Sequence, residues 1–219
     1  MWLRRLRVQS PSATPGHLNT SWWCLPIFLS SFGATQAVAQ GARSHIGIGI
    51  GRSIPTGAFR SDTTGEGFAG GWVVTGHVTL RAPLQLQRLR LRIDATYARN
   101  GANDRLKADL TTAFGQSADE RMTLLGADAS AVYPLAPASR FAPSLFGGIG
   151  VWHSTITVSV GGGSTHTSAT KLAWQLGGEL TRGRLFLELR YVAVAAAKGY
   201  PRTAFFPVSV GVRLGKRTL

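Results

Sequence analysis

The side chains of this 219-residue sequence that are most able to do chemistry are charged residues that recur at every second position of certain segments. Arg88, Arg90, Arg92 and Asp94 alternate with aliphatic residues. Because successive side chains of a β-strand point to opposite faces, these four charges share one face. The same alternation places further charges on the corresponding face of later segments: Asp128, Glu179, Glu188, Arg190 and Arg213.

Two kinds of chemistry are open to this set of charges. Paired with one another, they form a salt-bridge network, because a charge away from water is tolerated only when it has a partner. If the lumen were filled with water, the arginines would instead line a narrow conduit for anions. The interior of a closed barrel of about eight strands is just filled by side chains, so we predict the paired network and keep the conduit as the alternative.

Hydrolytic and metal chemistry find less support in the sequence. His153 and Ser154 are adjacent, so on a strand they point to opposite faces and do not meet as base and nucleophile. The histidines at 45, 77, 153 and 166 are too scattered to predict a metal site. The run Gly161-Gly162-Gly163 lies among serines and threonines and does not resemble a phosphate-binding turn between strand and helix. We therefore expect no enzyme activity and no cofactor.

The elements that position these charges are predicted strands. A period of two residues indicates strands at 45–53, 71–81, 86–98, 121–133, 141–157, 171–180, 185–194 and 204–214. Short connections around Pro83, at 134–140 and at 181–184 alternate with longer ones at 55–70, 100–120, 159–170 and 195–203. This alternation predicts an all-β fold: an eight-stranded antiparallel up-and-down transmembrane barrel with short turns at one end and long loops at the other.

The outward faces of these strands are apolar and end in aromatic residues. Ile46, Ile48 and Ile50 illustrate the pattern on the first strand, and an apolar outer face suits lipid contact. The predicted aromatic girdle is Trp72, Tyr97, Trp174, Tyr191 and Phe206 near the long loops, with Tyr133 and Phe141 near the short turns. We expect outer-membrane lipid to be the surrounding partner.

The first 39 residues have the pattern of a removable signal peptide. Arg4, Arg5 and Arg7 precede a short apolar run, and Ala37-Val38-Ala39 is a small-x-small cleavage site. Residues 40–219 would then be the barrel domain. The single cysteine, Cys24, lies in the leader. The formal net charge of the whole sequence is +14, but the arginines alternate with aliphatic residues on predicted strands instead of clustering with aromatic residues. The leader would also export the chain away from nucleic acid, so we expect no nucleic-acid partner.

From the Ala-Val-Ala site to Leu214, the chain resembles the small outer-membrane barrels of the OmpA/OmpX type. The likeness is one of architecture and extends to the alternating last strand, 206–214. It implies a location in the bacterial outer membrane and insertion by the barrel-assembly machinery. It also implies a structural or interaction role: envelope integrity, adhesion or lipid contact. We expect the loops at 60–68 and 100–119 to meet an external ligand or surface partner. A narrow pore for small anionic solutes is the alternative, and a lipid-modifying enzyme the third hypothesis.

Overall fold

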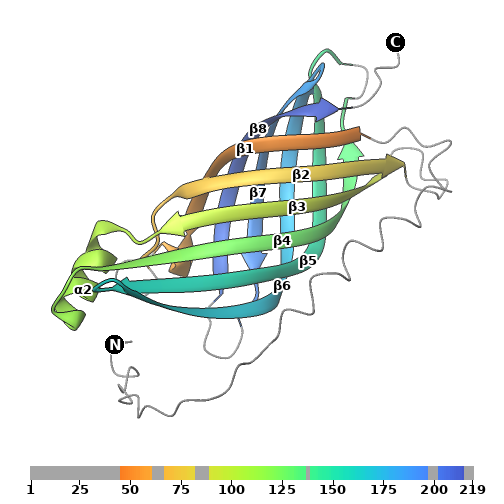
Figure 1. Cartoon of the computed structure of the whole chain (residues 1–219). Coiled ribbons are helices and arrows are strands. Elements are labelled where there is room, and N and C mark those ends of the chain that lie inside the picture. Colours follow the sequence, from red (N-terminus) through yellow and green to blue (C-terminus); the bar gives the residue numbers. More distant parts are fainter. Residues whose placement is uncertain (1–44, 61–66, 82–88, 137–138, 197–201, 215–219) are drawn as a thin grey trace. The chain divides into compact units, whose positions relative to one another are not determined.

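The computed structural model describes residues 45–60, 67–81, 89–136, 139–196 and 202–214. The predicted signal peptide and Arg88 lie outside these residues. Within them, eight strands form one closed barrel in chain order (Figure 1). The strands are β1 (His45–Thr56), β2 (Gly71–Arg81), β3 (Arg90–Gly101), β4 (Ala118–Pro134), β5 (Ala142–Val160), β6 (Gly163–Arg182), β7 (Leu185–Val194) and β8 (Thr203–Leu214).

Every neighbouring pair of strands is antiparallel, which confirms the predicted up-and-down fold. The first and last strands close the barrel through a register that runs from Ile46 opposite Leu214 to Thr56 opposite Ala204. The start of β1 and the end of β8 therefore lie side by side, at the end of the barrel where the short turns are. β6 and β7, for example, are joined there by only Gly183 and Arg184.

Alternation along each strand separates an apolar outside from an inside that holds the charges. On β1, Ile46, Ile48 and Ile50 are 48%, 50% and 61% exposed. On β3, Leu91 and Ile93 face outward, whereas Arg92 and Asp94 are buried in the lumen. The predicted faces of the described strands are therefore correct.

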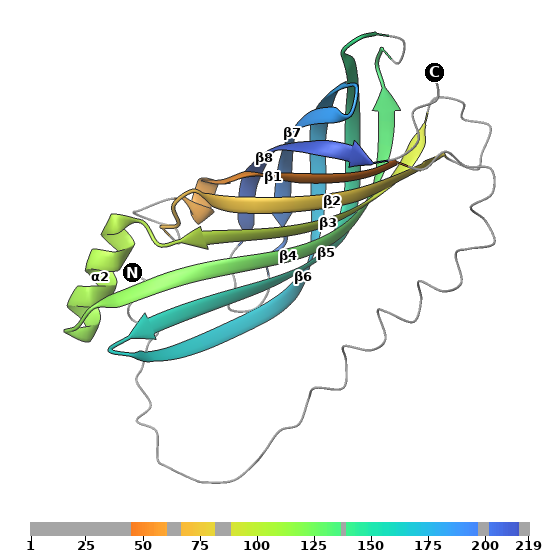
Figure 2. The same ribbon diagram turned by 45° about the horizontal axis from the view of Figure 1, so that its top comes forward.

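The hairpin of β5 and β6 is longer than the sequence predicts. A loop is expected at residues 159–170, but β5 continues to Val160 and β6 begins at Gly163. The turn consists of Gly161 and Gly162, whose φ values of 54° and 88° suit a tight two-residue hairpin. Figure 2 shows this hairpin reaching out at the end of the barrel where α2 also lies.

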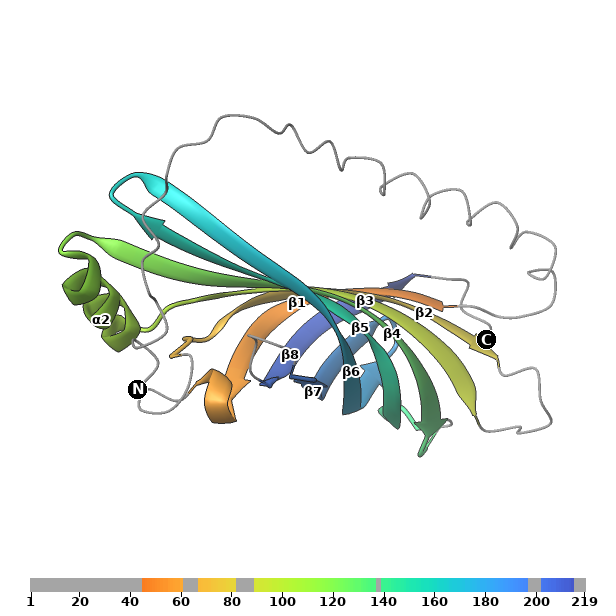
Figure 3. The same ribbon diagram turned by 90° about the horizontal axis from the view of Figure 1, so that it is seen from below.

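The second long connection, for which a loop at 100–120 is expected, contains a helix, α2 (Asp104–Phe114). The side chain of Asn103 caps the helix by accepting a hydrogen bond of 2.8 Å from the backbone N–H of Leu106. Gly115 ends the helix in the left-handed conformation, with φ of 68°. Figure 3 shows α2 beside the start of β4. No helix among the described residues is long and apolar enough to cross a membrane.

The mouth of the barrel at the long-loop end is filled by aromatic rings. Phe59, in the short helix η3 (Gly57–Phe59), contacts Phe68 with ring centroids 5.1 Å apart. Phe205 of β8 lies 6.4 Å from Phe59 and 5.4 Å from Trp152 of β5, again between centroids. All four rings are at most 1% exposed. These four rings, which we call the aromatic mouth, form an apolar cluster beside buried polar residues that include Asn100 and Lys171.

Candidate functional site

Arg92 of β3 lies at the centre of a buried cluster of charges inside the barrel. Its Nε donates to Oδ1 of Asp94 at 2.7 Å, and its Nη1 donates to Oε2 of Glu179 at 3.2 Å. Its Nη2 donates to Glu188 on β7. Each of these groups is at most 4% exposed. One guanidinium thus joins three carboxylates from three different strands.

Arg190 of β7 completes the same cluster and is fully buried. It contacts Asp94 at 3.3 Å and donates through Nε to Oε1 of Glu188 at 2.8 Å. Its Nη1 also donates to Thr96 Oγ1 at 3.2 Å and to Gln175 Oε1 at 3.0 Å. The donors of this guanidinium therefore have acceptors, as burial requires.

The ion pairs of the cluster balance in charge. Arg213 of β8 pairs with Glu179, so in the described part of the chain three arginines meet three carboxylates. The ring of Phe146 lies beside two of the guanidiniums, with its centroid 4.6 Å from Cζ of Arg92 and 5.7 Å from that of Arg190. These distances suit cation–π contacts. We call Arg92, Asp94, Glu179, Glu188, Arg190 and Arg213 the charge layer.

Asp128, which the sequence places among the paired charges, has a different partner. Its Oδ1 accepts a hydrogen bond of 2.9 Å from the indole Nε1 of Trp152. Antiparallel register sets Asp128 directly opposite Asp94, whose Oδ1 already accepts from arginines. Asp128 therefore lies beside the charge layer and is hydrogen-bonded to Trp152 at the long-loop end. The expected pairing of Asp128 with an inward arginine is replaced by this indole contact.

The indole of Trp152 fits because a glycine lies beneath it. A Cβ atom on Gly126 would lie 2.2 Å from the Trp152 ring, which is closer than real atoms approach. Gly126 and Trp152 are register partners on β4 and β5, so the ring lies across the neighbouring strand. The close approach explains why this inward position carries no side chain.

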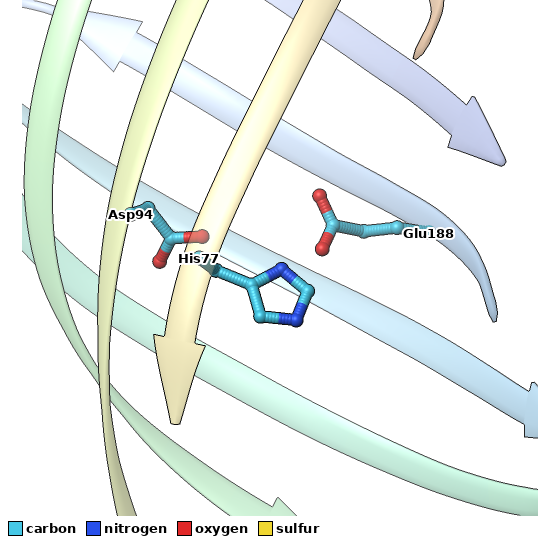
Figure 4. Close-up of side chains that lie close together, drawn as sticks. All are labelled: His77, Asp94 and Glu188. Atoms are coloured by element: carbon cyan, nitrogen blue, oxygen red, sulfur yellow. The ribbon is translucent and has the colours of Figure 1, made fainter. Parts of the chain in front are cut away.

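His77 lies near three carboxylates of the charge layer, and its Nε2 is 3.9 Å from Oε2 of Glu179. Figure 4 shows its ring between Asp94 and Glu188, and one ligand atom each from His77, Asp94 and Glu188 falls within 4.8 Å of the others. Both carboxylates already accept hydrogen bonds from Arg92 and Arg190. A divalent cation would have to compete with these two buried positive charges, so the ion pairs account for the acidic groups better than a metal does.

The remaining predicted residues lie as follows. Arg90 faces the lumen on β3 and is half-buried. On the outer face, ring centroids are 5.1 Å apart for Trp72 and Tyr97, 5.3 Å for Trp174 and Tyr191, and 5.0 Å for Tyr191 and Phe206. These pairs lie toward the long-loop end. Tyr133 and Phe141 lie exposed toward the short-turn end, and Cζ of Arg182 is 5.1 Å from the Phe141 ring centroid.

His153 and Ser154 lie on opposite faces, as the sequence predicts. His153 is exposed, and its Nδ1 is 3.0 Å from Oγ1 of Thr170. Ser154 is fully buried on the lumen side. The two side chains therefore do not form a pair of base and nucleophile.

Sequence reasoning missed the aromatic mouth. Trp152 and Phe205 each occupy an inward position, where alternation could have placed them, but only the outward aromatic residues were predicted to have a role. Phe59 and Phe68 lie within the connection at 55–70, which was expected to be an external loop. The available signal was the presence of two large apolar residues within one connection, because such side chains are usually buried.

Comparison with known proteins supports the fold. No family model and no curated protein matches the chain. Neisserial surface protein A (NspA) superposes with a TM-score of 0.50 at 19% identity, covering 81% of this chain and 100% of that chain. A major outer membrane protein from Thermus thermophilus gives 0.51 at 11% identity, covering 78% and 99%. The chain has the architecture of the small outer-membrane barrels.

Proposed function

We propose that this chain is a bacterial outer-membrane protein with a closed lumen, which acts through contacts made outside the barrel rather than by transport or catalysis. The observation that carries the proposal is its inverted polarity. Ile149 and Leu172 on the outside are 73% and 71% exposed, while Arg190 and Glu188 inside are fully buried. A barrel surrounded by lipid requires this arrangement, and a barrel surrounded by water does not.

Two layers in series support a closed lumen. The aromatic mouth of Phe59, Phe68, Trp152 and Phe205 lies above the charge layer, and none of these rings is more than 1% exposed. In the charge layer, the guanidiniums that would attract a passing anion already hold carboxylates. A conduit for anions needs arginines that are free to bind and release them. The narrow pore is therefore the weaker hypothesis.

The interaction role is supported by an open sheet edge on β6. Among the described residues, the register of β6 with β7 begins at Ala173, so residues 163–171 pair on one side with β5 alone. The carbonyl of Leu172 accepts from Ala195 N–H on the β7 side. Because peptide groups alternate in direction, Ser164, His166, Ser168 and Thr170 also direct theirs to the open edge. Such an edge can take up an extended polypeptide as a further strand.

The first test is location and folding. The protein should fractionate with the outer membrane and migrate differently on gels before and after heating, because a closed ladder without free edges within the membrane resists detergent. Insertion would use the barrel-assembly machinery, with β8 as the strand that is recognised. Recovery of the protein in the soluble periplasmic fraction would contradict the proposal.

A pair of arginine substitutions tests which face meets lipid. Leu187→Arg places a charge on the outer face of β7, whereas Thr112→Arg places it on the exposed surface of α2. A lipid-facing arginine near mid-membrane costs about 2–4 kcal/mol, so the yield of folded barrel in liposomes should fall for Leu187→Arg only. Equal yields would mean that the outer face is not in contact with lipid.

A further inference from the structure

The outer face carries arginines on two strands toward the long-loop end of the barrel. On β1, Arg52 is exposed and follows the outward isoleucines at 46, 48 and 50, and the outward Ile54 follows it. On β3, Arg99 follows Tyr97 in the same way and is half-buried. Trp72 of β2 is the register partner of both, so the outer face carries the row Arg52, Trp72, Arg99.

The aromatic residue in this row locates it relative to the membrane. Trp72 is 42% exposed and packs on Tyr97. Exposed tryptophan and tyrosine side chains of membrane proteins concentrate where the acyl chains meet the headgroups. The two arginines beside Trp72 therefore lie at the depth of lipid headgroups, and Arg52 follows Ile50 on the outer face of β1.

A cavity of about 530 Å³ lies next to the row. It has two cations in its lining, Arg52 and Arg60, and apolar walls that include Ile54, Pro55 and Phe68. Arg60 follows η3 and is exposed. The cavity therefore combines positive charge with apolar surface, which is what an amphiphile with an anionic headgroup requires.

We propose that this cavity binds the phosphorylated headgroup of a glycolipid of the outer leaflet, the phosphorylated acylated disaccharide known as lipid A. Arg52 and Arg60 bind a phosphate, since a guanidinium matches phosphate oxygens with two parallel hydrogen bonds. An acyl chain continues along Ile50, Ile48 and Ile46 below. The inference rests on the proposed outer-membrane location, which places the long-loop end in the outer leaflet.

The experiment uses the full barrel, purified in detergent and mixed with lipid A that carries both phosphates. Native mass spectrometry measures the fraction of protein with one lipid bound. The double variant Arg52→Gln/Arg60→Gln should bind about tenfold more weakly, because it loses charge-assisted hydrogen bonds. Arg105→Gln is the matched control, because Arg105 is exposed on α2 at the same end and lies outside the cavity lining. Its binding should equal that of the unaltered protein.

Three further binding measurements test the proposed lipid site. Lipid A without phosphates should bind the unaltered protein as weakly as the double variant binds the phosphorylated form. Equal binding of both lipids, or an equal loss in Arg105→Gln, would overturn the proposal. Displacement of the lipid by inorganic phosphate at equal concentration would also overturn it, because it would show a site for small anions. The Arg52→Lys/Arg60→Lys variant should retain part of the affinity.

Failure of this inference is separable from failure of the proposed function. Heat-modifiable mobility shows whether each variant is folded. A protein that inserts into bilayers but does not distinguish the two lipids contradicts the lipid site alone. A protein that does not insert at all contradicts the membrane location.

Discussion

At the scale of single residues, Glu188 is a carboxylate that joins two buried arginines inside the barrel. It accepts hydrogen bonds from Arg92 and from Arg190, which come from strands on different sides of the lumen. Neither arginine is more than 2% exposed, so neither can turn to water if that acceptor is lost. The charge balance of the layer depends on each carboxylate being present.

Replacing Glu188 by glutamine should therefore be strongly destabilising. The substitution keeps the size of the side chain but leaves one buried positive charge without a counter-charge, which costs about 3–5 kcal/mol. The matched control is Asp119→Asn, in the half-exposed ion pair with Lys107 at 3.9 Å, where the expected loss is below about 1 kcal/mol. Urea unfolding in liposomes measures both. Similar small losses would mean that water reaches the charge layer.

A second residue-scale prediction concerns the glycine under Trp152. Gly126→Ala places a methyl group where the indole now lies, so the ring must move and its hydrogen bond to Asp128 is broken. Overpacking of this kind costs about 1–3 kcal/mol. Gly76→Ala on the outer face of β2 is the control, since the nearest atom to its Cβ would be 4.0 Å away. Tryptophan emission should shift in Gly126→Ala alone, and an unchanged spectrum would contradict the packing.

The sequence indicates which residues face inward, but not which partners they have. Alternation alone places Arg92, Asp94 and Glu188 in the lumen. The partner of Asp128 depends on the relative register of β4 and β5 and on the space above Gly126. Register follows from the pairing of whole strands, and no local pattern encodes it.

At the scale of elements, strand number and order were predictable because each strand has its own apolar face and its own turn signals. The full length of the hairpin of β5 and β6 was not, because the outer part of β6, residues 163–170, has serine and threonine on both faces. On β5, the alternation of Ile156, Val158 and Val160 with threonine and serine was the signal that could have extended the strand. Helix α2 does carry signals in the sequence, although a loop was predicted there. Asn103 and Gly115 stand at the two ends of the segment as N-cap and C-cap.

The open edge of β6 leads to a prediction about strand addition. Ser168→Pro removes an N–H that points to the open edge while leaving the pairing with β5 in place, whereas Ser168→Ala keeps that N–H. Extended peptides selected from a random library on the nanodisc-embedded protein should bind the Ser168→Ala variant and not Ser168→Pro. Selected peptides that bind both variants equally would show that recognition does not use this edge.

Amide exchange gives an independent check of the same edge. The N–H groups of Ser164, His166, Ser168 and Thr170 should exchange rapidly in the absence of a partner. Those of Thr165, Thr167 and Ala169 should be protected, because they face β5. Uniform protection along residues 163–170 would mean that another segment already covers the edge.

At the scale of the whole molecule, the lumen is closed twice, by chemically different layers. The four rings of the aromatic mouth are packed and buried, and the charge layer fills the middle of the barrel because its arginines and carboxylates bind one another. Trp152 donates to Asp128, which lies opposite Asp94 but is not a member of the charge layer. Because the ion pairs of the charge layer include none of the aromatic residues, removing the aromatic mouth should leave the charge layer in place.

The consequence for transport is that loss of the aromatic mouth should not open a pore. Trp152→Ala/Phe205→Ala removes two of the buried rings but leaves the ion pairs of Arg92 and Arg190 with Glu188. In planar bilayers, the unaltered protein and this double variant should both be silent, with heat-modifiable mobility showing that the variant has folded. Anion-selective conductance steps in the double variant would show that the charge layer is hydrated and that the lumen is an anion conduit closed only at its mouth. A charge layer that seals the barrel requires two results. Neither protein should conduct ions, and Glu188→Gln should lose much of its stability.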